Sequence, residues 1–310
     1  MEQRRLGTSG LVVSTIGLGG NTFGATVDGD EAVKTIQHAI EQGITFIDSA
    51  DVYSQGRSEE LVGQAVQGIR SSVVIATKMG NQMNSGPHAV GLSRRWVHQA
   101  VEDSLRRLNT DYIDLFYAHR PDPHTPLEET LRAFDDLVRS GKVRYIGCSN
   151  YPAWEVAYGV GISKELHLDR WVAAQNRWNL IDGLDSPELE QAADFLGVGI
   201  IPFTPLASGI LTGKYKAGEE PQAGTRFADL AGLRGRLTAE KVEKAARVQK
   251  WAEERGHTAA EAAIAWLLAH PVVSSVIAGA RNPEQLTANI AAGEWTLTPE
   301  ERDELSALVA

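Results

Sequence analysis

The sequence predicts an α/β protein whose parallel strands close into a (β/α)₈ TIM barrel. Eight short apolar runs are typical of strands, and the first seven begin about 30 residues apart, the size of one strand–helix–strand unit. Helical patterns fill the intervals, which favours a parallel sheet covered by helices. Chains of this length commonly form one such barrel, so we expect residues 1–310 to be a single domain.

The predicted strands are rich in β-branched and aromatic residues. They begin near Thr15, Ile44, Val73, Tyr112, Val143, Trp171, Val198 and Val272. The last interval is much longer than the others, so an additional segment must follow the seventh strand.

The helices are predicted from apolar residues spaced three and four apart. One apolar face consists of Val97, Ala100, Val101, Ser104, Leu105 and Leu108, and another of Leu127, Leu131, Phe134 and Val138. Capping-box sequences begin at Thr125 and Thr298, and a variant begins at Asn282. Gly43 and Gly141 stand where helices should end.

Two segments depart from the repeat. Residues 4–13 predict an N-terminal β-hairpin with its turn at Ser9 and Gly10, placed to close the bottom of the barrel. Residues 206–237 form a long loop after strand seven that is rich in glycine and basic residues and has weak periodicity. Such connections are usually functional, so we expect a lid that grips a cofactor rather than a plain surface loop.

Composition and charge exclude several classes of function. A formal net charge of −10 and a pI of about 5.3 argue against nucleic acid as a partner. No apolar run approaches the ~20 residues of a membrane span, and the N-terminus lacks the apolar core of a signal peptide. We therefore expect a cytoplasmic protein without a membrane partner. The one cysteine, Cys148, allows no intrachain disulfide and should be a small buried strand residue.

Four polar residues stand at or just after predicted strand ends: Asp48, Tyr53, Lys78 and His119. Parallel barrels gather these ends at one mouth, where the chemistry takes place. An acid, a phenol, an amine and an imidazole together suit proton transfer to a carbonyl oxygen. Each residue alone also has a structural explanation, and the residue pattern does not choose between Asp48 and Asp51, because both precede a helix and suit a turn or cap. Asp114 should point away from the His119 side and make a structural hydrogen bond.

The segments DSADVYSQGRSEELVGQAV, ATK, LRRLNTDYIDLFYAHRPD, GKVRYIGCSN, PFTPLASGILTGKY and IAGARNPEQLTANI resemble the aldo-keto reductase superfamily, most closely its bacterial and channel-β-subunit-like branches. They follow the family's order and cover nearly the whole chain. The resemblance implies an NAD(P)H-dependent carbonyl reductase with a catalytic tetrad at Asp48, Tyr53, Lys78 and His119.

The chemistry of these residue types agrees with that tetrad. A free tyrosine, with a pKa near 10, is a weak acid at neutral pH. A lysine ammonium at ~4 Å can stabilise the phenolate by up to ~4 kcal/mol, so we expect the pKa of Tyr53 to fall to as low as ~7. Asp48 should hold Lys78 in place and keep it charged. His119 should orient the substrate carbonyl.

The cofactor implied by the resemblance is NADPH, with NADH bound more weakly. No Rossmann fingerprint is present, because the cluster Gly17–Gly20 lacks its third glycine. The family's cofactor contacts fall on Asp48, Gly20, Asn21, Ser149, Asn150, Gln175, Phe203, Thr204, Pro205, Leu206, Ser208, Lys214, Arg226, Gly279, Arg281, Gln285 and Asn289. Phe203 should stack on the nicotinamide ring. Arg281 should bind the 2′-phosphate, and the amides after Asn282 open a helix that favours phosphate.

The expected substrate is a small carbonyl compound in a pocket walled by Phe23, Tyr53, His119 and Trp178, although Phe23 and Trp178 suit core packing equally well. The expected protein is a monomeric reductase. A first alternative is a redox-sensing partner protein that binds NADPH and turns over slowly. A second is a cofactor-free lyase or hydrolase, but the eight histidines contain no HxH or HExxH spacing, and no metal site is predicted.

Overall fold

The computed structural model describes the chain apart from residues 84–85, 87, 217–218, 223–224, 230 and 281. All eight predicted strands are present in one parallel sheet, and the predicted fold class is confirmed. The sheet order is β11-β8-β7-β6-β5-β4-β3-β12. Its strands are β3 (Ile16–Gly19), β4 (Phe46–Asp48), β5 (Val74–Met79), β6 (Ile113–Ala118), β7 (Val143–Ser149), β8 (Trp171–Gln175), β11 (Gly199–Ile200) and β12 (Val276–Ala278).

The sheet closes on itself between its first and last strands. Parallel bridges join Ile200 to Val273 and Phe203 to Ile277. The Ile277 amide also donates to the Pro202 carbonyl at 2.9 Å. These contacts connect the β11 edge to the β12 edge, so the strands form a barrel.

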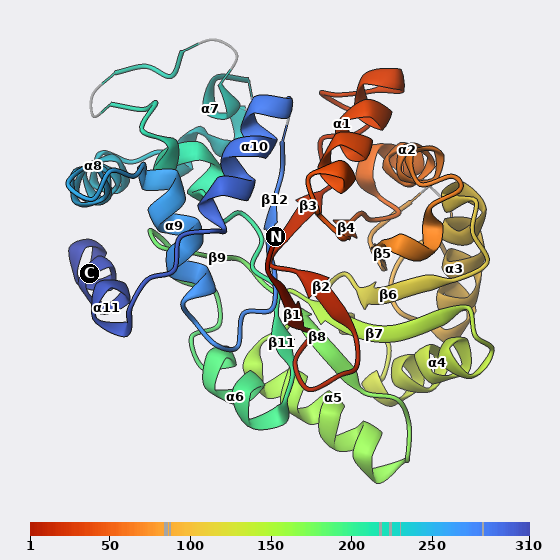
Figure 1. Cartoon of the computed structure of the whole chain (residues 1–310). Helices are drawn as coiled ribbons and strands as arrows, with labels where there is room; N and C mark the ends of the chain where they lie inside the picture. The colour runs from red at the N-terminus through yellow and green to blue at the C-terminus, as the bar shows by residue number, and fades with distance from the viewer. Residues whose placement is uncertain (84–85, 87, 217–218, 223–224, 230, 281) are drawn as a thin grey trace.

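Helices surround the barrel, as Figure 1 shows in a view along its axis. Their apolar faces lie against the strands, as the spacing in the sequence predicts; α3, for example, buries Val97, Val101 and Leu108. The helices are α1 (Gly29–Glu41), α2 (Arg57–Ala65), α3 (Arg94–Leu108), α4 (Leu127–Arg139), α5 (Ala153–Glu165), α6 (Leu189–Leu196), α8 (Ala239–Glu253), α9 (Ala259–Leu268), α10 (Pro283–Ala292) and α11 (Pro299–Val309), with short η2 (Arg70–Ser72).

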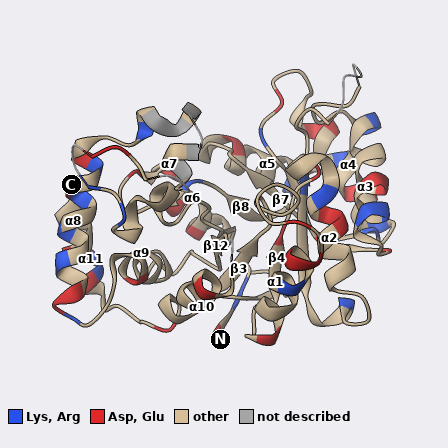
Figure 2. Ribbon diagram, turned by 90° about the horizontal axis from the view of Figure 1, so that it is seen from above, with Lys and Arg blue, Asp and Glu red and all other residues tan. Residues whose placement is uncertain are grey.

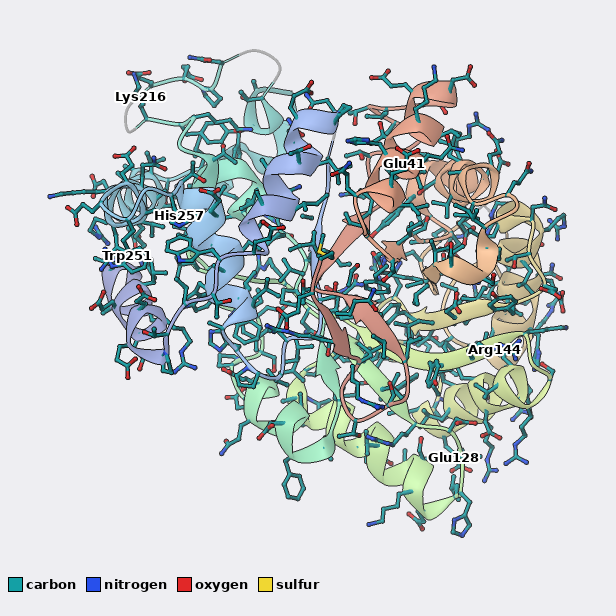
Figure 3. All side chains as sticks on the ribbon, viewed as in Figure 1. Glu41, Glu128, Arg144, Lys216, Trp251 and His257 are labelled. Carbon is teal, nitrogen blue, oxygen red and sulfur yellow. The ribbon has the colours of Figure 1, made fainter. Side chains whose placement is uncertain are left out.

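Helix α11 packs against α8 on the outside of the molecule. Trp295 packs beside these helices. Its ring stacks on the His257 ring, with 3.8 Å between ring centroids, and on the Trp251 ring, with 5.8 Å between centroids. Figure 3 shows Trp251 and His257 beside α8, away from the strands.

Most predicted helix signals are confirmed. Thr298 forms a complete capping box, and the Asn282 side chain accepts from the backbone of Gln285. Gly43 and Gly141 follow helices with φ values of 92° and 78°. The capping box predicted at Thr125 is wrong. Its hydroxyl donates to the Asp122 carboxylate at 2.7 Å, and α4 starts one residue after Pro126 without a side-chain cap.

The predicted N-terminal hairpin is present as β1 (Gln3–Arg5) paired antiparallel with β2 (Val12–Ser14). It lies in front of the strands in Figure 1. Leu6 and Val13 are fully buried and pack with Phe46 and Leu115 from the barrel interior. The hairpin therefore closes the barrel at one end, and the opposite mouth is left for the site.

The described part of the long connection after β11 contains three short helical segments: η3 (Ala207–Thr212), α7 (Arg226–Asp229) and η4 (Ala231–Arg236). Segment η3 packs on α8 and α9. A second hairpin, β9 (Trp178–Asn179) with β10 (Gly183–Leu184), follows β8 and was not predicted.

The outer helices carry acidic and basic residues interspersed with one another, as Figure 2 shows for α2, α3, α8 and α11. Within the described residues, no helix has the length and apolar character needed to cross a bilayer.

Candidate active site

Three residues of the predicted tetrad stand at the carboxyl ends of neighbouring strands. Asp48 is the last residue of β4, Lys78 is the next to last of β5, and His119 directly follows β6. The parallel register pairs Asp48 with Ala76 and Lys78 with Tyr117. Strand register therefore brings the three side chains to one mouth of the barrel.

Tyr53 comes from the turn that follows β4. It begins the short segment η1 (Tyr53–Gly56), in which Ser54 and Gln55 have left-handed φ values of 49° and 56°. Left-handed backbone is costly for residues with a side chain. The Ser54 hydroxyl donates to the Phe23 carbonyl at 3.0 Å, which helps to hold the turn and the ring of Tyr53 beside it.

Lys78 is the centre of the arrangement. Its fully buried ammonium donates to Asp48 Oδ2 at 2.6 Å, to the Ser49 carbonyl at 2.7 Å and to the Tyr53 hydroxyl at 3.5 Å. All three donor positions of the ammonium are directed at oxygen atoms, as a buried charge requires. The Tyr53 ring in turn meets the His119 ring edge-on, with 6.0 Å between centroids.

Burial and neighbouring charges set the pKa values of Lys78 and Tyr53. Burial alone would lower the pKa of Lys78, but the charge and hydrogen bond of Asp48, with those of Tyr53, outweigh it and raise that pKa. Burial raises the pKa of Tyr53 above its usual value, and the Lys78 ammonium offsets this only in part. The prediction of a Tyr53 pKa near 7 is therefore wrong for the protein alone, because it left desolvation out.

His119 is neutral at physiological pH. Burial, together with the positive charges of Lys78 and Arg120, lowers its pKa to about 3. Its Nδ1 is buried and has no hydrogen-bond partner among the described residues. A neutral imidazole can donate one hydrogen bond to a carbonyl oxygen but is not a strong acid.

The structure distinguishes Asp48 from Asp51, between which the residue pattern did not choose. Asp48 accepts from Lys78 and, at Oδ1, from Gln175 Nε2 at 2.8 Å. The Asp51 side chain makes no hydrogen bond to the ammonium, and the Asp51 backbone amide donates to the Lys78 carbonyl at 3.0 Å. Asp48 is thus the carboxylate that holds the ammonium.

Polar groups at the ends of β7 and β8 lie next to the tetrad. Ser149 pairs in register with Gln175. The Asn150 side chain donates to the Ser149 hydroxyl at 3.0 Å and to the His119 carbonyl at 2.9 Å. These amide and hydroxyl groups have the chemistry to bind a carboxamide such as that of nicotinamide. One N–H of Gln175 is already donated to Asp48.

Several other predicted cofactor residues meet at the β3–β12 seam. A side chain added at Gly279 would come within 3.6 Å of the Asn21 side chain, and Asn289 donates to the Gly279 carbonyl at 3.4 Å. Gly20 packs so closely that a Cβ would lie 2.8 Å from the Ser58 hydroxyl. Segments far apart in the sequence thus supply one surface of small and amide side chains.

The remaining cofactor predictions lie after β11. Phe203 bridges to Ile277, while Thr204 and Ser208 both have left-handed φ values of 59°. Lys214 folds back toward this loop, so that a Cβ at Gly209 would be 3.1 Å from its ammonium. Pro205 is buried and Leu206 partly so, and Gln285 is exposed on α10. Arg281 lies outside the described residues, as does the side chain of Arg226.

Two of the four predicted pocket walls, Phe23 and Trp178, are core residues. Phe23 is fully buried. Trp178 is 3% exposed and packs against the rings of Trp266 and His270, with centroids 6.0 and 4.6 Å away. Their contacts match the packing explanation that the sequence left open.

One supporting network was missed in the sequence. Glu59 is fully buried on α2, where it accepts from Thr77 and Arg107, each at 2.6 Å. Ser58, beside it, donates to the Gly20 carbonyl at 2.9 Å. The two adjacent glutamates Glu59 and Glu60, directly before the apolar Leu61 and Val62, were the available signal in the sequence. Asp114 has the predicted structural role, accepting from Arg70 at 2.7 Å and from the Ile75 amide at 2.9 Å.

Known proteins resemble this chain along its whole length. Residues 15–310 match the model of the aldo/keto reductase family. A probable voltage-gated potassium channel subunit beta of Oryza sativa subsp. japonica is 38% identical to this chain. The alignment covers 100% of this chain and 97% of that relative's length. The uncharacterized oxidoreductase YrpG of Bacillus subtilis is 36% identical, covering 97% of this chain and 93% of its own.

A relative with a named reaction is similarly close. The versiconal hemiacetal acetate reductase of Aspergillus parasiticus is 36% identical, covering 97% of this chain and 95% of its own length. With the barrel and the strand-end residues described above, these matches identify an oxidoreductase that acts on carbonyl compounds with a nicotinamide cofactor: the chain belongs to the aldo/keto reductase family.

Proposed function

We propose that this protein reduces aldehydes or ketones to alcohols with NADPH, and that Tyr53 donates the proton. The observation that carries the proposal is the buried Lys78 ammonium, which donates to both Asp48 and the Tyr53 hydroxyl. When bound, the cofactor supplies the hydride for the carbonyl carbon. The protein's own residues must then bind the carbonyl, exclude water and provide a proton to its oxygen.

Tyr53 and His119 divide the work on the oxygen. The neutral His119 offers a hydrogen bond that orients the carbonyl. Tyr53 keeps its proton at neutral pH because burial raises its pKa, so it is always ready to donate. An alkoxide is far more basic than a phenolate, so the transfer is downhill. Lys78 then stabilises the phenolate that remains, and Asp48 keeps Lys78 in position.

The residues available to hold the cofactor fit its chemical parts. Ser149, Asn150 and Gln175 present amide and hydroxyl groups beside the tetrad and suit the carboxamide. Phe203 offers an aromatic face to the nicotinamide ring. Amides at the start of α10 suit a phosphate, because the helix N-terminus carries partial positive charge. Arg281 would supply the preference for the 2′-phosphate of NADPH.

Tyr53→Phe tests the proposal. The variant keeps the ring and loses the acid, so we expect kcat for aldehyde reduction to fall by at least ~10² with NADPH affinity nearly unchanged. The matched control is Tyr151→Phe, which removes another buried phenol hydroxyl that has no hydrogen-bond partner among the described residues. Full activity in Tyr53→Phe would refute Tyr53 as the proton donor.

A second candidate is a redox-sensing partner protein that holds NADPH and turns over slowly. It is favoured by the 38% identity to a protein named as a probable channel subunit beta. The two candidates differ in kinetics. Cofactor release much slower than any carbonyl reduction favours the sensor, whereas rapid multiple turnovers favour the reductase.

A further inference from the structure

A small pocket lies beside the tetrad and is not used by the chemistry described above. It has a volume of about 110 Å³ and lies between the turn after β4 and the face of α3. Its lining consists of Asp51, Gln55, Met83, Trp96, Ala100, Asp103 and Arg107. One water needs about 10–15 Å³ of such volume, so several waters fit.

Two buried polar groups line this pocket without a partner. Asp51 is 1% exposed, and neither of its carboxyl oxygens makes a hydrogen bond within the described part of the chain. The indole N–H of Trp96, which is 8% exposed, is also unpartnered there. Buried groups of this kind are nearly always satisfied by protein or by ordered water. Asp51 and Trp96 both line this pocket, so water in the pocket is the candidate partner for the carboxyl oxygens and the indole N–H.

We propose that Asp51 and this pocket form a water-filled proton-exchange site beside the tetrad, and that Asp51 is a positioning residue whose charge controls the acidity of Tyr53. The second half of the proposal rests on the proposed function of Tyr53. In the exchange step, the Asp51 O–H bond breaks, its proton passes to a pocket water and then to bulk solvent, and the carboxylate keeps the electron pair.

The charges around Asp51 favour its protonated form. Burial and the negative charge of Glu59 on α2 raise its pKa to about 8, while the Val52 amide, Arg107 on α3 and Lys78 on β5 oppose this in part. Asp103 is the other carboxylate of the pocket, and its side chain is engaged by Gln99 and Arg106. Asp51 therefore changes charge at mildly alkaline pH.

The ionised form of Asp51 acts on Tyr53 through its field. Its negative charge is one of the influences that raise the pKa of Tyr53, after burial and the charge of Asp48. Above about pH 8, ionised Asp51 should thus keep Tyr53 protonated to higher pH. The expected result is an extension of the alkaline range of carbonyl reduction.

The titration of Asp51 is measured first, on the unmodified protein, by carboxyl ¹³C NMR with Asp51 assigned through its own backbone. We expect a midpoint between pH 7 and 9, close to the value of about 8 given by its surroundings. Ala100→Leu then fills the pocket from α3. Without water the carboxylate is harder to form, so the midpoint should move to higher pH. A midpoint near 4, or one that Ala100→Leu leaves unmoved, overturns the exchange site.

The link to Tyr53 is measured separately by single-turnover carbonyl reduction after brief pH jumps to values between about 8 and 12, because the pKa of Tyr53 is raised above its usual value near 10. Asp51→Asn should move the alkaline limb of the pH–rate profile to lower pH by about one unit, the shift expected for a single charge ~10 Å away at an effective dielectric of about 20. Asp103→Asn removes a charge from the same pocket and should leave the limb in place. An unmoved limb in Asp51→Asn overturns the control of Tyr53. If instead Tyr53→Phe stays active, the proposed function fails, while the NMR result for the exchange site still stands.

Discussion

The two sides of the barrel mouth are built in different ways. On the side of β4, β5 and β6, Asp48, Lys78 and His119 follow directly from strands whose register fixes them. On the side of β11 and β12, the predicted cofactor residues lie on helix α10 and on the loop after β11, in which Thr204, Ala207 and Ser208 have left-handed backbone.

This difference suggests a division of labour. Proton chemistry tolerates little error in distance, so its groups are best held by rigid strands and by a buried ion pair. Binding and release of a large cofactor require movement, and loops carry such function well. We therefore expect substitutions on the strand side to affect stability and catalysis together. Those on the loop side should affect cofactor affinity with little change in stability.

Lys78→Met should cause the largest effect. It leaves the Asp48 carboxylate buried without its ammonium, which costs about 3–5 kcal/mol of unfolding free energy. We also expect kcat to fall by at least ~10². Urea unfolding and steady-state kinetics measure the two effects, and Lys142→Met, on the surface, is the control.

Adding Asp48→Asn to Lys78→Met tests the cause of the instability. The double variant has no uncompensated buried charge, so its stability should return close to that of the parent while its activity stays low. If the double variant is as unstable as Lys78→Met, lost packing rather than charge accounts for the effect.

Arg281→Ala tests the loop side. Removing a hydrogen bond to a charged phosphate should cost about 1.5–3 kcal/mol of NADPH binding. NADH binding and unfolding free energy should barely change. Dissociation constants for both cofactors, in this variant and in the control Arg144→Ala, decide the matter. An equal loss for the two cofactors would mean that Arg281 does not bind the 2′-phosphate.

His119→Gln should change how stability depends on pH. The pKa of His119 is lowered to about 3 in the folded protein, against about 6.5 when unfolded. Below pH 6.5 the unfolded chain therefore binds a proton that the folded protein does not, and stability falls as the pH falls. Between pH 6.5 and pH 5, the unfolding free energy of the parent should fall by up to about 2 kcal/mol more than that of the variant. Unfolding free energies at both pH values measure it, with His124→Gln as control, and an unchanged slope contradicts it.

Ala207→Gly should have the smallest effect, with opposite sign. Ala207 has a φ of 48°, a conformation that costs a residue with a Cβ roughly 1 kcal/mol. Glycine relieves that strain, so the unfolding free energy should rise by up to about 1 kcal/mol. In helix α10 the same change at Ala288 should lower it by about 1 kcal/mol. A loss of stability at both positions would show that the loop is not strained.

The sequence by itself determined the barrel and the location of its chemistry. Alternating strand and helix patterns are local properties, so all eight strands and the face of α3 were predictable. The placement of Lys78 and His119 at strand ends followed from the same pattern. Capping at Thr298 was predictable because its partner is three residues away.

Only the tertiary structure decided which side chains contact residues far away in the sequence, and how burial shifts their pKa values. Asp48 and Asp51 are three residues apart, but the first meets Lys78 and Gln175 while the second faces a pocket lined by α3. Trp178 packs against Trp266, which is far away in the sequence. The direction of the Tyr53 pKa shift depends on how completely the folded chain removes water from the phenol. Burial and long-range contacts of this kind arise from the packing of the whole barrel, and no local pattern encodes them.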